Sequence, residues 1–389
     1  MKKALAFFIF LLFLNVPASA EEAQEITLSS AFKVAGKGWT MERLFDRDWN
    51  TYWQGETSGK KLEITPREKA YGLYLCWMEE PKSWVLEEKV DGAWMTTEFE
   101  AAPFMHQYVP LRGAAALRLK PKGKNTKWFG LSEVFIFGKG EVPSSVQQWQ
   151  SPDNACDLMV YFAHPDDEAL FMGGTIPYYA GERGLDVVAA VFTGSTRTRR
   201  SELLNSLWTM GMRNYPVFGP FHNSYSLKLA AAYEQFGENK VKRFAVELMR
   251  RYRPKVVVTH DVLGEYGHGM HQLCADSALY AFDRAGDATL FPDSAEKWGA
   301  WQVQKLYLHL YPENRLEMDW DIPLDFFGGR TAFEMAQAGY EQHLSQHRYE
   351  QYLVEPRSGD KSSYLFGLAK TVVGQDEQKV DFLEHVEAQ

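Results

Sequence analysis

Residues 26–138 alternate hydrophobic and polar positions in short runs, with turn-forming residues between the runs. The clearest runs are LEITP at 62–66, YGLYLCW at 71–77, SWVLEEKV at 83–90, LRLKP at 117–121 and EVFIFG at 133–138. None of these runs repeats with the 3.6-residue period of an amphipathic helix. Many short strands of this kind predict an all-β sandwich, and we assign it to residues 21–140.

The pattern changes after this unit. The polar segment 141–152 contains two prolines and predicts a linker. Beyond it, apolar runs at 157–163, 185–193, 215–218 and 255–260 alternate with helical stretches such as 199–211 and 238–252. This alternation predicts an α/β domain over 153–389, with a Rossmann-like, mostly parallel sheet covered by helices on both faces.

Two polar clusters follow strands of this predicted sheet, where ligands bind in α/β folds. HPDDE at 164–168 follows the strand 157–163, and GEYGHGMH at 264–271 follows the strand 255–260. Crowded carboxylates at a buried strand end cost stability unless a cation sits among them. Imidazole and carboxylate ligands suit zinc or a similar divalent ion such as Fe²⁺, and a catalytic zinc has about three protein ligands.

The first twenty residues have the composition of a secretory signal peptide. Lys2 and Lys3 precede an apolar run at 4–14, and the small residues 18–20 suit a signal peptidase. We therefore predict export to the periplasm or the medium, with cleavage after Ala20. No later run has about eighteen apolar residues, so the mature chain is expected to lack a transmembrane segment.

Charge and cysteine content narrow the functional classes. The formal net charge of −9 argues against a nucleic-acid partner. Cys76, Cys156 and Cys274 are scattered and odd in number, so we expect buried thiols rather than a disulfide framework. Aromatic residues make up 14% of the chain, and they serve equally to stack on sugar rings or to fill a core. The oligomeric state is not predictable from these features.

The α/β half resembles the PIG-L or LmbE-like zinc-dependent de-N-acetylases. The resemblance runs from about Asp157 to His271 and includes HPDDE, the glycine pair at 173–174, the RxxE spacing at 199–202 and HxxH at 268–271. It implies a set of roles for residues at these positions. The implied zinc ligands are His164, Asp167 and His271. The other implied site residues are Asp166 as general base, His268 and Tyr266 beside the reacting carbonyl, and Arg199 as a substrate-side or structural arginine.

Such a group of residues can hydrolyse an amide. Zinc lowers the pKa of a bound water towards about 7, and Asp166 can accept the proton of that water. Zinc, His268 and Tyr266 can then stabilise the oxyanion and protonate the departing amine. For Arg199, between Arg197 and Arg200, a solvated basic surface is the alternative. Glu168 is expected to cap the next helix, His260 to be a core histidine, and His343 and His347 to be surface or substrate-edge residues.

The β half resembles the discoidin, or coagulation-factor C-type, jelly-roll family through LFDRDWNTYWQG at 44–55 and the late strand LSEVFIFG. The resemblance implies a glycan-binding role and a structural calcium ion, with oxygens from Asp46, Asp48 and Glu133. The alternative is that the two aspartates satisfy the turn backbone. Arg47 stands where that family usually has glycine. Trp49 and Trp53 are either buried or available to stack on sugar.

Together these features predict a secreted metal-dependent hydrolase that removes the N-acetyl group from an N-acetylated amino sugar or glycoconjugate. One alternative keeps the metal and changes the amide to a thiol–sugar conjugate or a lipid-linked or antibiotic acyl group. A second alternative is a non-catalytic carbohydrate-binding protein.

Overall fold

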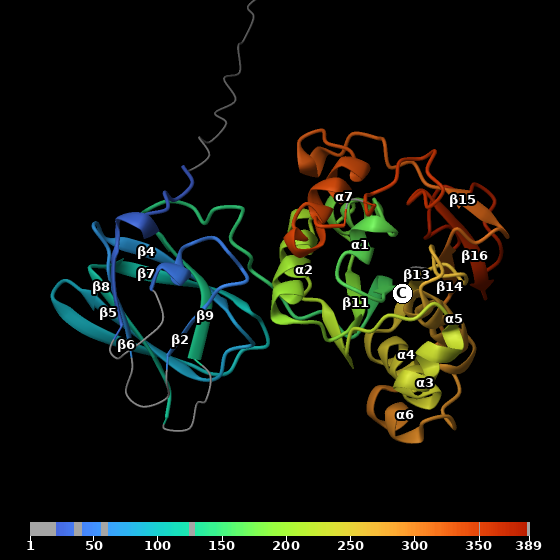
Figure 1. The fold of residues 1–389 in the computed structure, drawn as a ribbon, viewed down its shortest axis with the longest axis horizontal. Helices are drawn as coiled ribbons and strands as arrows, with labels where there is room; N and C mark the ends of the chain where they lie inside the picture. The colour runs from blue at the N-terminus through green and yellow to red at the C-terminus, as the bar shows by residue number, and fades with distance from the viewer. Residues whose placement is uncertain (1–20, 35–40, 56–60, 124–128, 350, 387–389) are drawn as a thin grey trace, which may run out of the picture.

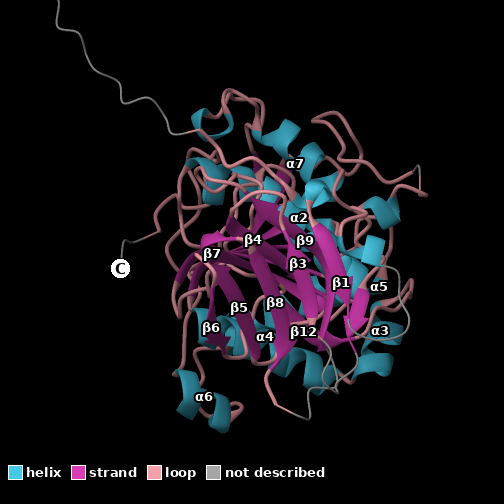
Figure 2. Ribbon diagram, turned by 90° about the vertical axis from the view of Figure 1, so that its left-hand side faces the viewer, coloured by secondary structure: helices cyan, strands magenta, loops and turns pink. Residues whose placement is uncertain are grey.

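The computed structural model describes residues 21–34, 41–55, 61–123, 129–349 and 351–386. The predicted signal peptide lies outside these residues. An all-β unit and an α/β unit lie side by side (Figure 1). Turned by 90°, the strands of the β unit face the viewer, and helices of the α/β unit lie behind them (Figure 2).

The β unit is a sandwich of two antiparallel sheets, which confirms the predicted all-β fold. One sheet has the order β1 (Ala31–Val34), β3 (Leu62–Thr65), β8 (Ala116–Pro121), β5 (Trp84–Val90) and β6 (Ala93–Phe99). The other has the order β2 (Trp53–Gly55), β9 (Phe129–Phe137), β4 (Ala70–Trp77) and β7 (His106–Ala114). Trp53, Trp77 and Trp84 fill the core between the sheets. Two short 3₁₀ turns, Thr27–Ser29 and Met41–Leu44, complete the unit.

The α/β unit is built on a seven-stranded sheet. Its order is β12 (Val217–Phe221), β11 (Val187–Thr193), β10 (Cys156–Phe162), β13 (Pro254–Thr259), β14 (Lys305–His309), β16 (Leu365–Thr371) and β15 (Arg315–Glu317). The first five strands pair in parallel, whereas β16 is antiparallel to both β14 and β15. After β10 the chain builds outward on one side through β11 and β12, and then on the other through β13 and β14. The strand order therefore reverses between β10 and β13, where ligands bind in such sheets.

Helices cover both faces of this sheet, because residues of β10 alternate between two hydrophobic cores. Leu158 and Val160 belong to one core, and Met159 and Tyr161 to the other. The first core includes α1 (Asp167–Leu170), α2 (Arg197–Thr209) and α7 (Ala332–Tyr340). The second includes α3 (Leu229–Phe236), α4 (Glu238–Tyr252) and α5 (Gly269–Arg284), with α6 (Pro292–Trp298) beside α4. A π-helical turn at Pro177–Glu182 and 3₁₀ turns at Asp325–Phe327 and Leu344–Gln346 connect these elements.

The segment predicted as a linker is packed between the two units. Val146, Gln147 and Trp149 are buried. Gln147 Nε2 donates to Asn205 Oδ1 on α2 over 2.6 Å, and Trp208 Nε1 of α2 donates to the Ser144 carbonyl over 2.9 Å. The connection between the sandwich and the α/β unit thus lies directly against α2.

Of the residues predicted to hold calcium, Asp46 and Asp48 accept hydrogen bonds within the loop, whereas Glu133 Oε1 is buried without a partner in the described structure. Asp46 Oδ1 accepts from the Asp48 backbone N–H over 3.0 Å, and its Oδ2 accepts from Thr51 Oγ1 over 2.8 Å. Arg47 has a φ of 62° and donates through Nη1 to Glu133 Oε2 over 2.9 Å. The two aspartates therefore stabilise the turn, and a guanidinium supplies positive charge to Glu133. Calcium finds no support in this arrangement.

Several smaller expectations can be compared with the structure. The three cysteines are free thiols in buried positions, as predicted. Trp53 lies in the sandwich core, and the Trp49 ring packs 5.8 Å from the His106 ring, centroid to centroid. In the part of the chain that the structure describes, the helices are too short or too polar to cross a lipid bilayer.

Candidate metal and catalytic site

The HPDDE turn is the short connection between β10 and α1. Asp166 has a φ of 120°, which costs about 1–3 kcal/mol in a non-glycine residue. Hydrogen bonds hold the turn in this conformation. The His164 backbone N–H donates to Asp167 Oδ2 over 2.7 Å, and the Asp166 N–H donates to Glu168 Oε2 over 2.8 Å. All five residues are buried, so the strained turn presents its carboxylates at a fixed position.

His164, Asp167 and His271 bring three possible ligand atoms together at this strand end. His164 Nδ1 lies 3.2 Å from Asp167 Oδ2 and 3.3 Å from His271 Nε2. His271 Nε2 lies 3.4 Å from Asp167 Oδ1. Ligands at 2.0–2.1 Å from a tetrahedral zinc ion lie about 3.3 Å from one another. The two histidine nitrogens and the Asp167 carboxylate are therefore spaced to hold a single cation.

The position of the ring hydrogen on His271 also supports a cation at this site. Its Nδ1 faces Glu265 Oε2 at 2.7 Å, so this nitrogen carries the hydrogen and Nε2 carries the lone pair. The lone pair is directed at the Asp167 carboxylate, an arrangement that a cation between them stabilises. Burial lowers the pKa of His271, although the Asp167 and Glu265 carboxylates oppose this effect. Burial opposes ionisation of Asp167, but the surrounding His271, His164 and His260 rings hold its pKa well below its usual range.

Asp166 pairs with Arg199 and is not one of the three possible metal ligands. Arg199 Nη2 on α2 lies 2.9 Å from Asp166 Oδ1, and the same guanidinium donates to the Pro165 carbonyl. Burial raises the pKa of Asp166 to about 7, with Arg199 opposing the rise and Asp167 adding to it. The Arg199 side chain is only 15% exposed, so it does not belong to a solvated basic surface.

His268 and Tyr266 lie on the other side of the ligand group. His268 begins α5, and its Nδ1 accepts from the Met270 N–H over 3.2 Å, which leaves the hydrogen of the neutral ring on Nε2. Burial lowers the pKa of His268 to about 3, and the neighbouring His164 and His271 rings add to this effect. The Tyr266 ring lies 5.2 Å from the His271 ring, and burial raises its pKa. Both side chains are therefore neutral hydrogen-bond donors at physiological pH.

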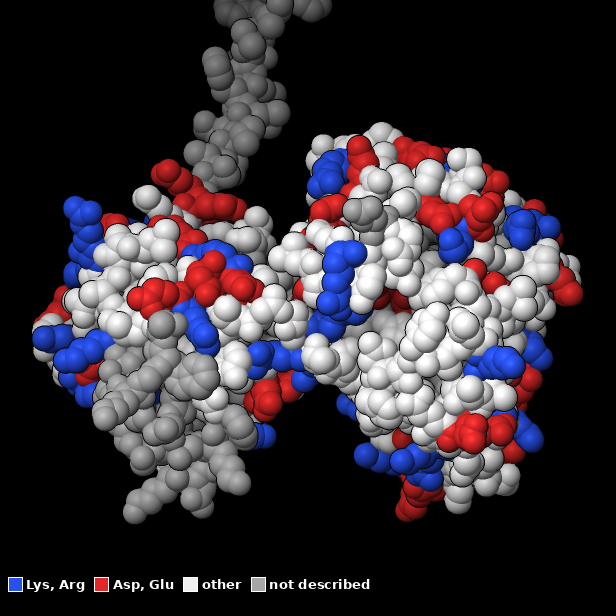
Figure 3. Space-filling view, in the orientation of Figure 1, with Lys and Arg blue, Asp and Glu red and all other residues white. Residues whose placement is uncertain are grey.

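These residues surround a cavity of about 410 Å³ at the carboxyl ends of the strands. Six of the seven predicted site residues line it, and His271 lies behind its wall, fully buried. The lining residues are His164, Asp166, Asp167, Leu170, Phe171, Arg199, Asn223, Ser224, Tyr225, Tyr266, His268, Gln346, Tyr349 and Tyr352. The space-filling view shows a hollow on this unit with acidic atoms at its floor (Figure 3).

Residues 159–282 match the PIG-L family model, GlcNAc-PI de-N-acetylase. This match confirms the resemblance for the segment that carries both strand-end motifs. Among curated relatives, 1D-myo-inositol 2-acetamido-2-deoxy-alpha-D-glucopyranoside deacetylase 2 of Saccharopolyspora erythraea is 28% identical over 183 residues. That alignment covers 40% of this chain and 66% of the relative, so it spans just under two thirds of the relative's length.

Two solved structures have weak likeness to parts of the chain. N,N'-diacetylchitobiose deacetylase from Pyrococcus horikoshii has 16% identity and a TM-score of 0.38, over 52% of this chain and 77% of its own. Chitosan-binding module 1 from a chitosanase/glucanase of Paenibacillus sp. IK-5 has 17% identity and a TM-score of 0.26, over 30% of this chain and 99% of its own.

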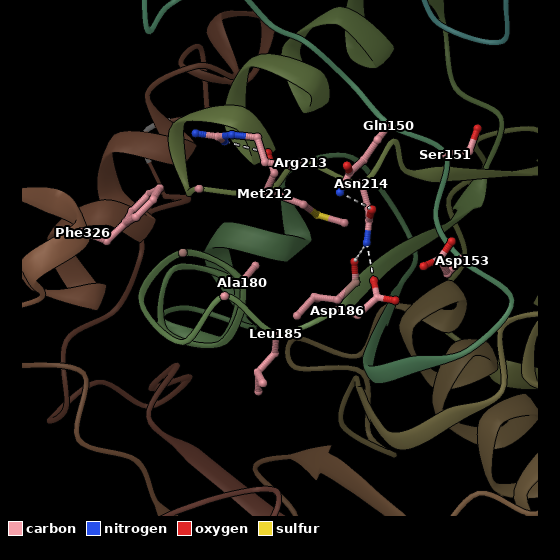
Figure 4. A pocket seen from close by; sticks show the side chains of 14 residues that line it. Gln150, Ser151, Asp153, Ala180, Leu185, Asp186, Met212, Arg213, Asn214 and Phe326 are labelled. Atoms are coloured by element: carbon pink, nitrogen blue, oxygen red, sulfur yellow. Dashed lines mark hydrogen bonds between the residues drawn. The ribbon is translucent and has the colours of Figure 1, made fainter. Parts of the chain in front are cut away.

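A larger cavity, of about 520 Å³, lies near the amino end of β11, away from the PIG-L motifs (Figure 4). Its polar side chains bond to one another: Gln150 Nε2 donates to Asn214 Oδ1 over 3.2 Å, and Asn214 Nδ2 donates to Asp186 Oδ1. It contains none of the predicted site residues. The smaller cavity is therefore the candidate active site, because only that one combines the ligand group with the non-ligand carboxylate.

The structure corrects the expectation for His343. This side chain is fully buried, and its Nε2 lies 2.7 Å from Glu168 Oε1. Ser206 Oγ on α2 donates to the same oxygen over 2.7 Å. Glu168 does satisfy the backbone N–H of Asp166 at the start of α1, as expected, but it also joins α1, α2 and the 343–346 turn. His347 is on the surface, as expected, with its side chain 37% exposed.

Sequence reasoning missed Glu265 and His309. Glu265 Oε1 lies 3.0 Å from both His260 Nδ1 and His309 Nδ1, while its Oε2 meets His271. His260 is buried, as expected, and its Nε2 lies 3.3 Å from Asp167 Oδ2. Glu265 stands in the motif already quoted at 264–271, but only the fold brings three histidines to its carboxylate.

Proposed function

We propose that this protein is a metal-dependent hydrolase that removes the N-acetyl group from an N-acetylated amino sugar. The observation that carries the proposal is the convergence of His164, Asp167 and His271 beside a buried, non-ligand carboxylate, Asp166. The family match and the names of the curated relatives, which are deacetylases of an N-acetylated glucosamine derivative, support the same reaction.

His164, Asp167 and His271 would hold zinc or a similar divalent ion such as Fe²⁺. When bound, such an ion supplies Lewis acidity, which lowers the pKa of a water ligand and polarises a carbonyl. The two imidazoles and one carboxylate match the donor set of catalytic zinc sites with three protein ligands. His164 Nδ1 is the nitrogen that faces Asp167 and His271, and in the described structure its Nε2 is buried without a hydrogen-bond partner.

Asp166 is the proton carrier in this proposal. Because its pKa is raised to about 7, the carboxylate can accept a proton from attacking water and return it to the departing nitrogen at neutral pH. Arg199 engages Oδ1 and keeps the carboxylate from turning away, and we assign the transferred proton to Oδ2. His268 Nε2–H and the Tyr266 hydroxyl are the donors for the negative charge that develops on the substrate carbonyl oxygen.

The wall of the cavity favours an uncharged sugar. Asn223, Ser224 and Gln346 offer neutral polar groups, and Tyr225 and Tyr349 offer exposed aromatic rings. Among the described residues that line the cavity, the only Lys or Arg is Arg199, whose guanidinium is engaged by Asp166. Apart from the proposed metal ion, the described lining offers a phosphate group no unpaired Lys or Arg, so we propose a neutral N-acetylated sugar or glycan as substrate.

The β-sandwich is proposed to hold the glycan on which the site acts, on the basis of its sequence resemblance. Trp53 is buried in the sandwich core and is not available to a sugar, whereas Trp49 is half-buried. We also propose that the protein works in the periplasm or the medium, because residues 1–20 have the composition of a signal peptide.

The deciding experiment measures acetate release by zinc-loaded mature protein from a panel of N-acetylated sugars and glycans. Asp166→Asn keeps the shape of the side chain and removes its ability to accept a proton. We expect wild type to release acetate and the variant to retain zinc while losing about 10²–10⁴ of the rate.

The control is Asp157→Asn on β10, the strand that precedes the HPDDE turn; this carboxylate pairs with Lys255 and does not line the cavity. It should keep both zinc and activity. If zinc-loaded wild type releases acetate from no member of the panel, the deacetylase proposal is overturned. The remaining alternatives are then hydrolysis of another amide and sugar binding without catalysis.

A further inference from the structure

The carboxylate of Glu265 is fully buried at the centre of a histidine cluster. Glu265 lies in the loop between β13 and α5, and its φ of 51° turns the side chain inward from a conformation that non-glycine residues rarely adopt. Four donors meet the carboxylate: His260 Nδ1, His309 Nδ1 and the Asp261 N–H at 3.0 Å each, and His271 Nδ1 at 2.7 Å. A buried carboxylate is stable only with such compensation.

The Glu265 carboxylate shows where the neighbouring histidines carry hydrogen. His260 Nδ1 faces Glu265 Oε1 at 3.0 Å, and because a carboxylate oxygen only accepts, this nitrogen carries the hydrogen. His309 Nδ1 faces Glu265 Oε1 at 3.0 Å and its Nε2 faces the Ser362 carbonyl at 3.1 Å, so hydrogen-bond acceptors fix the ring on both sides. The cluster is therefore a hydrogen-bonded network in which Glu265 accepts and the histidines donate.

The ligand-type atoms of His260, Glu265 and His271 also lie close enough to hold a cation, but this assignment favours a hydrogen-bonded network over a second metal ion. A metal would need lone pairs on the histidine nitrogens that face the carboxylate, and those nitrogens carry hydrogens instead. His260 and His271 stack with centroids 4.1 Å apart and planes at 17°, which fixes the orientation of both rings. The free lone pair of His271 is then on Nε2, directed at Asp167.

The network connects the metal-ligand group to three strands of the sheet. His260 follows β13 and bonds to Ala163 after β10, and His309 ends β14. His260 Nε2 also lies 3.3 Å from Asp167 Oδ2. Glu265 thus contacts one proposed ligand directly and reaches a second through His260.

We propose that Glu265 is the positioning residue that fixes the ring orientation and tautomer of His271 and thereby sets the affinity of the metal site. The inference rests on the metal site of the proposed function. It does not depend on the substrate, because Glu265 lies outside the cavity lining, behind the ligands. A carboxylate behind a ligand histidine strengthens metal binding by orienting the ring and raising its basicity.

The test compares zinc affinity of wild type and Glu265→Gln by competition with a chelator of known affinity. Glutamine keeps the size of the side chain but places an NH₂ group or a weaker acceptor against His271 Nδ1. We expect the Kd for zinc to rise about 10–100-fold, and the absorption bands of the Co²⁺-loaded protein to shift because the ligand field changes. Circular dichroism checks that the variant is folded.

Two further variants separate positioning from general loss of stability. Asp376→Asn removes another buried carboxylate of the same unit, which bonds to Lys305 and Tyr307, and it should keep wild-type zinc affinity even if the melting temperature falls. His309→Gln removes a Glu265 partner that does not reach the ligands, and it should raise the Kd by a smaller factor than Glu265→Gln.

Unchanged zinc affinity and an unchanged Co²⁺ spectrum in folded Glu265→Gln would overturn the inference. If Glu265→Gln does not fold, the His309→Gln result decides, and wild-type affinity in that variant contradicts the proposal. If wild type binds zinc but releases no acetate, only the deacetylase proposal fails. If wild type binds no zinc, both the proposed metal site and this inference fail.

Discussion

Arg199 and Asp166 form a buried ion pair, with 2.9 Å between Nη2 and Oδ1, that joins the first turn of α2 to the strained turn after β10. The same turn of α2 also contacts the sandwich. The Arg197 guanidinium lies 4.0 Å from the centre of the Tyr52 ring, and Arg200 pairs with Glu80. The position of the proposed proton carrier therefore depends on a helix held between the active site and the β unit.

Replacing Arg199 by methionine is expected to lower kcat about 10–100-fold, because a misplaced catalytic group loses much of its effect even when it is chemically intact. Zinc affinity should stay within about twofold of wild type, since Arg199 contacts none of the three ligands of the proposed site. Steady-state kinetics and chelator competition on the same preparations measure both quantities.

The matched control is Arg197→Met on the same helical turn, which loses a contact with the sandwich but no contact with Asp166. It should retain most of the activity. Equal kcat in wild type and Arg199→Met would show that Asp166 needs no arginine to be positioned.

Tyr225 is expected to bind a sugar unit of the substrate without taking part in the chemistry. Its side chain is 68% exposed at the rim of the cavity, with its ring 5.1 Å from that of His268. Tyr225→Ala should raise KM about fivefold for an N-acetylated disaccharide, from the loss of about 1 kcal/mol of stacking, and should leave kcat nearly unchanged. Tyr280→Ala, on α5 outside the cavity lining, is the control and should change neither constant. A fall in kcat with an unchanged KM would place Tyr225 in the reaction itself.

Phosphate on the sugar is expected to reduce turnover. Among the described lining residues, the one arginine is engaged by Asp166, so apart from the proposed metal ion a phosphate dianion would lose hydration without gaining a basic partner. N-acetylglucosamine 6-phosphate should show a kcat/KM at least about tenfold below that of N-acetylglucosamine, since 1.4 kcal/mol of unfavourable binding already gives that factor. Competition assays at several salt concentrations would separate repulsion from steric exclusion. Equal kcat/KM for the two sugars would contradict the proposed preference for neutral substrates.

The sequence was sufficient to predict those strands and motifs whose pattern lies within a short stretch of the chain. Parallel strands are buried on both faces, so β10 and β11 appear as nearly continuous apolar runs, and α4 occupies the predicted residues 238–252. The two motifs at 164–168 and 264–271 were recognisable because each crowds ligand-type residues after a strand. Their meeting at one point then follows from the adjacency of β10 and β13.

Long-range partners could not be predicted in this way. Strand β14 contains the buried Lys305 and His309, whose polar side chains interrupt the apolar pattern, and their partners Asp376 and Glu265 are distant in the chain. His343 reaches Glu168 across 175 positions. A single histidine or carboxylate with such a remote partner has no spacing signal, so only the folded structure separates it from a surface residue.

His106 provides a prediction about pH that concerns the sandwich alone. It lies buried on β7, with its Nδ1 2.5 Å from the Tyr74 hydroxyl, and burial lowers its pKa to about 3. In the unfolded chain a histidine has a pKa of about 6.5. Between these two values the unfolded chain binds a proton that the folded chain does not, so acid favours unfolding. The contribution of His106 to stability is present above about pH 6.5 and is lost as the pH falls towards 3.

His106→Gln and His106→Phe should both remove this contribution. The free energy of unfolding of wild type, relative to either variant, should therefore fall by about 2 kcal/mol between pH 7 and pH 5. Urea titrations at the two pH values, followed by tryptophan fluorescence, give the difference in the free energy of unfolding between wild type and each variant at each pH. The titration of the other histidines is common to wild type and variant and cancels in these differences. Differences that are the same at pH 7 and pH 5 would mean that His106 takes up a proton in the folded protein, and that the pocket formed by Tyr74 and Trp49 accommodates the charged ring.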